Sequence, residues 1–490
     1  MRYLKSSLLL ILLSNVNLAV AATYYVKPNG SDSANGLSNA TAWKSINKVN
    51  SFSFKAGDDV YLLSGGSWNT ELTVDWSGTS SNRVIIGSYY MNNGNEVLGA
   101  KPNTSKPKLV GTYPAKFEVA GAVPAGRYGG MVQVAANYVT VKNIRIENSS
   151  GIGINLAREF HHAIFENNEV DVTAGSSILL HRKTYSSIMR NNKMRKCGQG
   201  WKDKVMSGTW PVCNGAIGSR NNIIENNTVT ESYGEGIVAF ASGADNNIIR
   251  GNTLVVVRTV GIYVDNGANN IVENNLVVGD STEGNRGSAF ALNVEDYPAM
   301  KDATGNVFRN NLAANTGTCF WMGMEPDALS KGYKVGGSFI GNTCVGADKS
   351  FGYGNTGSEV QNFKVANNIF SGSTENFCKV PSTPNISFSN NLWEVKPSDT
   401  DCHSNNDTIA NPKLVKTAGW ANTSPSNIPK PEDFRLQSGT PVYGKGVEDS
   451  NLTKDYFGSV RPSVPALGAV DTNSQSSALS APTGLSLSFN

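Results

Sequence analysis

Ile223-Ile224-Glu225-Asn226-Asn227-Thr228-Val229-Thr230 places two short runs of apolar and β-branched residues on either side of an asparagine pair. The same pair, Asn-Asn or Gly-Asn, recurs along the chain at intervals of 24, 35, 25, 23, 36, 31, 26 and 23 residues. The shortest intervals are about 23 to 26 residues, and longer intervals occur between them. This pattern is typical of a solenoid in which loops are inserted on some turns. The pairs begin at Asn167, Asn191, Asn226, Gly251, Asn274, Asn310, Gly341, Asn367 and Asn390.

Each repeat contains three short apolar runs. In one repeat they are Ile223–Glu225 before the pair, Thr228–Thr230 after it, and Ile237–Phe240 following Gly236. Runs of three to five residues with β-branched content, bounded by glycine and asparagine, indicate strands rather than helices. Asparagine suits the tight corner because it tolerates the left-handed backbone conformation and can hydrogen-bond to like residues along a stack. The predicted coil is therefore strand, asparagine turn, strand, variable turn, strand, variable turn.

Residues 1–21 have the features of a secretory signal peptide. Arg2 and Lys5 precede an apolar run at 8–13, and Ala19-Val20-Ala21 supplies the small-residue pattern of a cleavage site. We therefore expect a secreted or periplasmic protein. No later apolar stretch approaches the ~20 residues needed to cross a bilayer, so no transmembrane segment is expected.

The first part of the mature chain, residues 22–75, is predicted to form an N-terminal cap and the first coil. Apolar residues at helical spacing within 42–52 predict a short helix that covers the exposed edge of the solenoid. Residues 57–62 are predicted to form the first strand.

The solenoid itself is assigned to residues 76–473 as one long domain, since each coil packs only on its neighbours. Residues 433–436 and 467–469 are expected to be its last strands. Residues 474–490 are rich in serine and are assigned to a tail or a linker to another module.

Charge and cysteine content narrow the range of partners. The 42 basic and 39 acidic residues nearly balance, so neither nucleic acid nor a membrane surface is an expected partner, and we expect a monomer. The six cysteines of an exported chain are expected to form disulfides, and their spacing matches no metal-binding pattern. Cys378 and Cys402 are predicted to pair because they lie one coil apart, and Cys197 and Cys213 because they flank an insertion. Cys319 and Cys344 then pair by elimination.

Three further motifs accompany the asparagine turns. They are the opening Tyr24-Tyr25-Val26-Lys27-Pro28-Asn29-Gly30-Ser31-Asp32, then Gly234-Glu235-Gly236-Ile237, and Gly261-Ile262-Tyr263-Val264-Asp265-Asn266. With them the chain resembles the right-handed parallel β-helix proteins of the pectate-lyase-like superfamily, over nearly all of its mature length. The resemblance implies an all-β, right-handed parallel β-helix. It leaves the activity open, because that superfamily contains polysaccharide lyases, glycoside hydrolases, epimerases and non-catalytic surface proteins.

One strand of the coil is bordered by every long insertion. The insertions 196–214 and 279–287 precede this strand, whereas 294–305 and 325–337 follow it, and together they would form a cleft suited to a polymer. We align its copies with Ile178, Ile217, Ile237, Ile262, Phe290 and Phe320 as first positions, which alternation points inward. The second and fourth positions then face outward, and they include His181, Arg220, Phe240, Tyr263, Asp265, Asn293 and Trp321.

The leading hypothesis is an enzyme that cleaves an extracellular, uronate-containing polysaccharide by β-elimination. This reaction needs a cation at the carboxylate, a base for the C5 proton and an acid at the leaving oxygen. Arg220, expected in the column of Asp265 two coils away, is assigned to the first role, His181 or Lys183 to the second and Tyr263 to the third. Asp265 would orient the cation or bind a metal.

Substrate binding is assigned to Glu235, Arg258, Asn293 and Trp321, with Trp321 as a surface on which a sugar ring can stack. No cofactor is required, but Asp265, Asn293, Glu295 and Asp296 gather oxygen atoms of the kind that calcium prefers, without a fixed calcium motif. Structural roles remain open for these residues. In these alternatives Asp265 and Arg220 are a pair of solvated charges, and His181 is a structural histidine. Lys183 is then a surface lysine, and Glu235 forms a structural ion pair.

Two other functions remain open. A glycoside hydrolase on the same fold would use Asp265 with Glu295 or Glu235 as its two carboxyl groups. A non-catalytic polysaccharide-binding surface protein would use Tyr263 and Trp321 as platforms. The sugar, the linkage and endo or exo action are not determined, and a biofilm or capsule matrix is as open a source of the polymer as a plant or algal wall.

Overall fold

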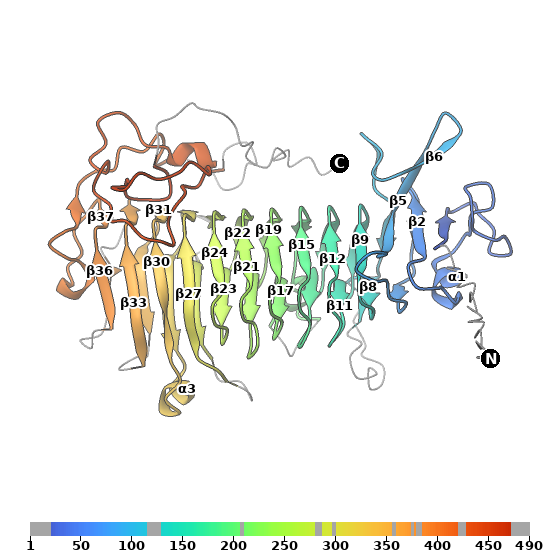
Figure 1. The fold of residues 1–490 in the computed structure, drawn as a ribbon, viewed down its shortest axis with the longest axis horizontal. Coiled ribbons are helices and arrows are strands. Elements are labelled where there is room, and N and C mark those ends of the chain that lie inside the picture. The colour runs from blue at the N-terminus through green and yellow to red at the C-terminus, as the bar shows by residue number, and fades with distance from the viewer. Residues whose placement is uncertain are drawn as a thin grey trace, which may run out of the picture.

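The computed structural model describes residues 21–114, 129–205, 210–279, 287–295, 300–354, 359–373, 377–378, 385–419 and 428–471. In these ranges the chain winds into coils whose strands form three long sheets, in which neighbouring coils pair in parallel. Figure 1 shows the coils stacked along the long axis, from the N-terminal end in blue to the C-terminal end in orange and red. The predicted parallel β-helix is therefore confirmed.

Sheet A contains the strand that precedes each asparagine turn, and its strands pair in parallel except for the hairpin of β5 and β6. Its strands are β1 (Thr23–Val26), β2 (Asp59–Leu63), β5 (Val84–Asn92), β6 (Asn95–Leu98), β9 (Val139–Lys142), β12 (Ile164–Glu166), β15 (Ile188–Arg190), β18 (Ile223–Glu225), β21 (Ile248–Arg250), β24 (Ile271–Glu273), β27 (Ala303–Arg309), β30 (Val335–Ile340), β33 (Val360–Ala366) and β36 (Ile386–Ser389).

Sheet B contains the strand that follows the asparagine turn. Its strands are β3 (Ser67–Trp68), β7 (Lys108–Val110), β10 (Arg145–Ser149), β13 (Glu169–Thr173), β16 (Lys193–Arg195), β19 (Thr228–Ser232), β22 (Thr253–Val257), β25 (Leu276–Val278), β28 (Leu312–Ala314), β31 (Thr343–Val345), β34 (Ile369–Ser371), β37 (Leu392–Trp393) and β38 (Thr408–Ile409).

Sheet C contains the third strand of each coil, the one bordered by the insertions. Its strands are β4 (Leu72–Val74), β8 (Gly130–Val134), β11 (Ile152–Leu156), β14 (Ile178–Leu180), β17 (Val212–Ile217), β20 (Glu235–Phe240), β23 (Val260–Asp265), β26 (Ser288–Val294), β29 (Thr318–Met324), β32 (Lys349–Gly354) and β35 (Phe377–Cys378). The described helices are α1 (Ile46–Ser51), α2 (Gln199–Lys202), α3 (Pro326–Ser330) and the 3-10 turns η1 (Thr400–Cys402) and η3 (Pro431–Phe434).

The two residues of each asparagine pair have different tasks. Asn226 is exposed and adopts a left-handed backbone with φ 55°, and Gly251 takes the same place in the next coil with φ 64°. Asn227 is buried, and its side-chain Nδ2 donates to the carbonyl of Met189 at 2.9 Å and to Asn252 Oδ1 at 3.1 Å. The first residue therefore turns the chain, whereas the second bonds coil to coil.

The buried amides form a continuous ladder through the solenoid. Each backbone N–H and each side-chain Nδ2 donates to the side-chain oxygen of the next residue in the series, and the last of the series donates its backbone N–H to Asp407 Oδ1 at 2.9 Å. The corner between sheets A and B thus has its polar groups paired inside a dry core. The ladder consists of Asn168, Asn192, Asn227, Asn252, Asn275, Asn311, Asn342, Asn368 and Asn391.

A second ladder lies at the corner between sheets C and A, and the sequence analysis did not identify it. Asn222 Nδ2 donates to Asn247 Oδ1 at 2.9 Å, and the series continues through Asn270 to Asn306. Ser187 precedes it and accepts from the N–H of Ala163 at 3.1 Å. The sequence signal was present, since an asparagine stands directly before the apolar run of sheet A in these coils.

The N-terminal cap agrees with the prediction in its helix but not in its first strand. The helix within 42–52 is α1, whose N-cap Ser45 accepts a hydrogen bond from the N–H of Lys48 at 3.1 Å. The strand predicted at 57–62 is present as β2, but it is not the first, because β1 at Thr23–Val26 precedes it in the chain and pairs with it at the end of sheet A. The cap has the order strand, helix, strand. This order does not occur in the repeats, so the repeat pattern did not predict it. Residues 1–20 of the expected signal peptide lie outside the described ranges.

The end of the described chain does not continue the coils. Residues 433–434 belong to the turn η3, residues 467–469 form no strand, and the last strand is β38. The prediction of late strands there is therefore wrong. Phe434, Leu436 and Leu467 are apolar because they pack against the outer face of sheet B, where they bury outward side chains of β25, β28, β31 and β34. The tail 474–490 lies outside the described ranges.

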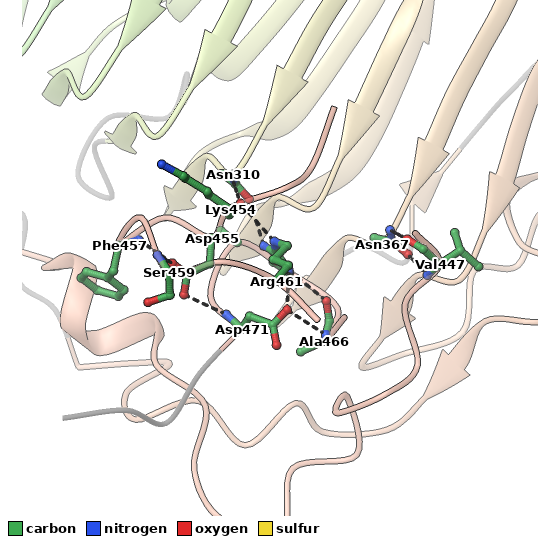
Figure 2. A network of polar contacts seen from close by, with 12 residues as sticks. Asn310, Asn367, Val447, Lys454, Asp455, Phe457, Ser459, Arg461, Ala466 and Asp471 are labelled. Carbon is green, nitrogen blue, oxygen red and sulfur yellow. Dashed lines mark hydrogen bonds and ion pairs between the residues drawn. The ribbon is translucent and has the colours of Figure 1, made fainter. Parts of the chain in front are cut away.

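Arg461 forms a buried ion pair within this C-terminal segment and also fastens the segment to the coils by a hydrogen bond to Asn310 (Figure 2). Arg461 is 7% exposed, and its Nη1 lies 3.3 Å from Asp471 Oδ2 while its Nη2 donates to Asn310 Oδ1 at 2.9 Å. The guanidinium also donates to the carbonyls of Ala466 and Gly468, at 3.1 and 2.7 Å. Asn310 is the outer residue of its asparagine pair, so in this coil the turn residue also binds the covering segment.

Three disulfides join the cysteines in the predicted pairs. They are Cys197–Cys213, Cys319–Cys344 and Cys378–Cys402, which fit an oxidising compartment. In the part of the chain that the structure describes, no helix combines the length and the apolar character that a membrane span requires.

Replacing Asn252 by alanine should destabilise the protein by about 3 kcal/mol, because it removes an amide that pairs with four buried groups. Chemical denaturation followed by circular dichroism measures the loss. Asn226→Gly is the matched control, since glycine adopts the left-handed conformation freely, and it should change stability by less than about 0.5 kcal/mol. Equal effects of the two variants would contradict the division of tasks within the pair.

Replacing Arg461 by methionine should cost about 3 to 5 kcal/mol, because it leaves Asp471 without its buried cation. Limited proteolysis should then cleave the C-terminal segment faster than it cleaves the coils. Lys364→Met is the control, since its pair with Asp449 at 2.7 Å is partly exposed, and it should cost no more than about 1 kcal/mol. Proteolysis of the segment at the wild-type rate would contradict the fastening role.

Candidate active site

The register of sheet C fixes which side chains face outward. Ile237, Ile262 and Phe290 are paired across β20, β23 and β26 and lie in the core, as predicted. Tyr263 and Asp265 alternate with the core residues of β23. Asp265 pairs with Phe240 on one side and Asn293 on the other, so the predicted column is confirmed for these coils.

The predicted alignment of Ile217 to Arg220 is wrong by three residues. Asn214, not Ile217, pairs with Ile178 and Ile237, while Ile217 pairs with Phe240. The hydrophobic pattern was misleading because the inward position is occupied by a fully buried asparagine. Arg220 consequently lies beyond the end of β17, where it forms an isolated bridge with Tyr185 and places its guanidinium 5.3 Å from the ring centre.

Three carboxyl groups, those of Asp265, Glu295 and Glu235, interact electrostatically at this part of sheet C. Asp265 is fully buried, and its Oδ1 accepts hydrogen bonds from Asn266 Nδ2 at 2.8 Å and from the backbone N–H of Glu295 at 3.0 Å. Asn266 Nδ2 also donates to the carbonyl of Glu295 at 3.0 Å, so both sides of that residue's backbone are held. Glu235 is the third carboxyl group. The charge of Glu295 raises the pKa of both Glu235 and Asp265.

Tyr263 and Asn293 position the side chain of Glu295. The Tyr263 hydroxyl donates to Glu295 Oε1, and Asn293 Nδ2 donates to the Tyr263 hydroxyl oxygen at 3.1 Å. Tyr263 comes from β23, whereas Asn293 comes from the next coil, so the arrangement depends on the pairing of two coils. The site therefore combines five of the predicted residues, namely Glu235, Tyr263, Asp265, Asn293 and Glu295.

Two glycines allow Glu235 to reach this cluster. A Cβ at residue 234 would lie 1.9 Å from the carbonyl oxygen of Pro211, and one at residue 236 would lie 2.4 Å from Leu254 Cδ2. The chain on both sides of Glu235 thus packs more closely than any other residue type permits.

Burial is the main influence on the protonation of the cluster. It raises the pKa of Glu235 to about 8 and that of Asp265 well above its usual value, and Glu295 raises both further. Burial likewise raises the pKa of Tyr263, with Asp265 and Glu295 as further causes. Among the described residues no lysine or arginine forms an ion pair with Glu235 or Asp265. Burial therefore favours the protonated form of both carboxyl groups, and Glu295 Oε1 is a hydrogen-bond acceptor beside them.

The residues assigned as bases lie elsewhere. His181 follows β14, three strands from β23 in sheet C, which is about 14 Å at the usual strand spacing. Burial lowers its pKa to about 3, with Arg158 and Arg182 as further causes, so its imidazole is neutral. Lys183 is exposed and forms an ion pair with Glu159 at 2.9 Å. The structure therefore does not bring the base candidates to Asp265.

The remaining predicted residues lie around the cluster. Arg258 is exposed in the turn before β23, with its guanidinium 4.3 Å from the ring centre of Tyr233. Trp321 is half-buried two coils from Tyr263 in the same row, and it lies over Gly352 and Gly354, where added Cβ atoms would come within 2.4 and 2.6 Å of its ring. The sequence analysis did not identify Asn266, although it stands beside Asp265.

Calcium binding stays a prediction. Asp265 Oδ1 and Glu295 Oε1 already accept hydrogen bonds from N–H and O–H groups, which leaves fewer oxygen atoms for a cation. In the described ranges no three histidine, cysteine or acidic side chains are grouped so that they would hold a metal ion. Asp296, the fourth predicted ligand, lies outside these ranges.

Replacing Asp265 by asparagine should stabilise the protein at neutral and alkaline pH. A carboxyl group with a raised pKa keeps a proton in the folded state that the unfolded chain releases above about pH 4, so the free energy of unfolding falls as pH rises. Asparagine keeps the accepting Oδ1 without this penalty. Thermal unfolding from pH 5 to 9 should show a shallower decline than in the wild type, while Asp75→Asn at an exposed position should follow the wild type. A lower melting temperature of Asp265→Asn at every pH would contradict a protonated Asp265.

Comparison with known proteins shows similarity in structure rather than in sequence. No protein-family model matches the chain, and no curated protein matches it. The fold is similar to that of pectate lyase Pel9A, with a TM-score of 0.52 and 15% identity over 93% of this chain and 98% of that one. It is also similar to XylC in complex with xylose, with a TM-score of 0.56 and 13% identity over 92% and 98% of the two chains. A rhamnogalacturonan lyase has a TM-score of 0.50 and 15% identity over 90% and 99%.

These likenesses establish the architecture alone. Three parallel sheets, short strands and an N-terminal capping helix agree with the right-handed parallel β-helix of those proteins. The chain therefore has the pectate-lyase-like fold that its sequence motifs predicted.

Proposed function

We propose that the protein is an exported glycoside hydrolase that cleaves an extracellular polysaccharide at the carboxyl cluster of sheet C. The supporting observation is a set of three interacting carboxyl groups, in which burial raises the pKa of Glu235 to about 8 and that of Asp265 well above its usual value. Hydrolysis of a glycosidic bond requires one protonated and one ionised carboxyl group. This was the second hypothesis from the sequence, and the geometry supports it better than the first.

Within the cluster the roles follow from exposure and hydrogen bonding. Glu235 is partly exposed and has a pKa of about 8, so it is assigned as the general acid. Glu295 is also partly exposed, and its Oε1 is held by the Tyr263 hydroxyl, so it is assigned as the base or nucleophile. Asp265 is fully buried beneath them and holds the backbone of Glu295, which makes it a positioning residue.

The proposed reaction breaks the bond between the anomeric carbon and the bridging oxygen. The proton of Glu235 moves to that oxygen, and the leaving sugar departs with a hydroxyl group. In one alternative Glu295 removes a proton from the attacking water, which adds its oxygen to that carbon. In the other, Glu295 attacks the anomeric carbon, and water, deprotonated by Glu235, then cleaves the resulting ester and frees the Glu295 carboxylate. A neutral sugar is the better substrate at this position, because a uronate carboxylate beside three carboxyl groups would have no described cation to pair with.

β-Elimination fits the described site less well. The cation assigned to it, Arg220, lies outside the column, the His181 imidazole is distant, and Lys183 is paired with Glu159. The elimination reaction therefore stays a prediction without support from the described residues. Export, a monomeric state and independence of calcium also stay predictions.

Incubation of the purified protein with neutral and uronate-containing polysaccharides tests the proposal. Saturated reducing ends are expected, and Glu235→Gln and Glu295→Gln should each lower kcat by about 100-fold to 10,000-fold, because each removes a proton-transfer group or nucleophile. The activity of the wild type should fall as pH rises through about 8, where Glu235 loses its proton, and this limb should be absent in Glu235→Gln.

Three outcomes would contradict the proposal. Unsaturated products would indicate a lyase, and binding without cleavage across the panel would indicate a non-catalytic module. Full activity of Glu235→Gln and Glu295→Gln with saturated products would place the chemistry elsewhere. Lys364→Met, a substitution under the C-terminal segment, controls for general effects of mutation on folding.

A further inference from the structure

We propose that Trp201, Trp210, Tyr233 and Arg258 form a subsite that binds an acidic sugar of the polysaccharide next to the cleaved bond. The inference rests on the proposed function for its place in the reaction, but the binding it describes can be measured without cleavage. We refer to these four residues as the aromatic rim.

The rings of the aromatic rim follow one another at stacking distances. The centres of Trp201 and Trp210 are 5.3 Å apart, and those of Trp210 and Tyr233 are 6.1 Å apart. The Arg258 guanidinium carbon lies 4.3 Å from the centre of the Tyr233 ring. The four side chains therefore form a row that extends from the insertion of sheet C to the turn before β23.

This row is open to solvent although it is aromatic. Trp210 is 40% exposed, Trp201 and Tyr233 are partly exposed, and Arg258 is exposed. Large aromatic side chains usually bury their faces in a core, so the exposed face of Trp210 is a surface of the kind that binds ligands. Sugar rings have an apolar face of C–H groups that stacks on such rings while their hydroxyl groups remain in water.

The insertion that supplies the two tryptophans is fixed to the coils. The disulfide Cys197–Cys213 closes its base, and Tyr233 N–H donates to the carbonyl of Cys197 at 3.0 Å. The N–H of Gly200 donates to the carbonyl of Ala174 at 3.0 Å, which attaches the start of the insertion to an earlier coil. A platform held in this way loses little conformational freedom when it binds a ligand.

The aromatic rim adjoins the proposed acid. Tyr233 lies two residues before Glu235, and the N–H of Glu235 donates at 3.3 Å to the carbonyl of Pro211, the residue after Trp210. A Cβ at residue 234 would lie 1.9 Å from that carbonyl oxygen, so the glycine there permits this close contact. A polysaccharide with one sugar at Glu235 would therefore place a neighbouring sugar at the aromatic rim.

Arg258 gives the aromatic rim its charge preference. Its planar group is stacked on Tyr233, and in this position its N–H groups can donate to a carboxylate as a pair of parallel hydrogen bonds. The carboxyl cluster beside it disfavours an anion, so a uronate carboxylate is accepted at the aromatic rim and not at the cleaved bond. A polymer that carries uronate residues beside neutral ones meets both requirements.

Affinity electrophoresis tests the subsite independently of catalysis. The protein is run through gels that contain polygalacturonate, alginate or glucuronoxylan, each compared with its carboxyl-reduced form. We expect at least one acidic polymer to retard the wild type more than its reduced form does. Trp210→Ala should weaken this binding about tenfold, and Arg258→Gln should remove the preference for the acidic form while it retains binding to the reduced form.

Matched substitutions on the C-terminal segment control for surface chemistry. Tyr443 is an aromatic residue of similar exposure, 39%, and Arg435 is stacked on Phe457 at 3.9 Å, so Tyr443→Ala and Arg435→Gln should leave retardation unchanged. Circular dichroism confirms that each variant is folded. No retardation by any acidic polymer, or unchanged retardation of Trp210→Ala and Arg258→Gln, would overturn the subsite.

The result separates this inference from the proposed function. Glu235→Gln should lose cleavage but keep the retardation of the wild type, because its carboxyl group is not part of the aromatic rim. If no polysaccharide is hydrolysed while Trp210→Ala and Arg258→Gln still lose binding, the hydrolase proposal fails and the subsite remains. If cleavage occurs and binding is unaffected by these variants, the subsite fails and the hydrolase remains.

Discussion

The buried ladder of asparagine amides is the interaction on which the rest of the structure depends. A closed coil of short strands must turn sharply, and each turn leaves backbone N–H and C=O groups that point into a dry core. The ladder pairs these groups with side-chain amides at about 3 Å, from one coil to the next. Because every amide both donates and accepts, a slip of one coil would leave unpaired polar groups inside the core.

Strict stacking at the ladder also fixes the register of sheet C, where the carboxyl cluster lies. Asp265 and Asn293 occupy equivalent positions on neighbouring coils, and Tyr263 reaches Glu295 across the same pair of coils. Burial of a carboxyl group is destabilising, and it raises the pKa of both Glu235 and Asp265, for which no described lysine or arginine forms an ion pair. The ladders and the apolar core supply the stability that holds these groups together, which is a common arrangement in active sites.

The regular and irregular parts of the coil have separate tasks. Left-handed asparagine or glycine residues make the uniform corner between sheets A and B, and the C-terminal segment covers the outer face of sheet B. The corner between sheets B and C is variable, and it contains the disulfide-closed insertion and the aromatic rim. One corner thus provides repetition, while the other accommodates insertions of variable length.

The sequence by itself determined the fold, the three strands of each coil, the disulfide pairs and the gathering of Tyr263, Asp265, Asn293 and Glu295, whereas only the structure brought Glu235 to them. These follow from local patterns, because a period of one coil places residues about 24 positions apart side by side. It did not determine the register at Asn214, where a buried polar residue occupies a core position, so Arg220 was placed in the wrong column. The protonation of Glu235 and Asp265 and the fastening of the C-terminal segment by Arg461 were decided only by the tertiary structure. Burial and contacts between residues as distant as Asn310 and Arg461 depend on how the whole chain packs, and no local pattern records them.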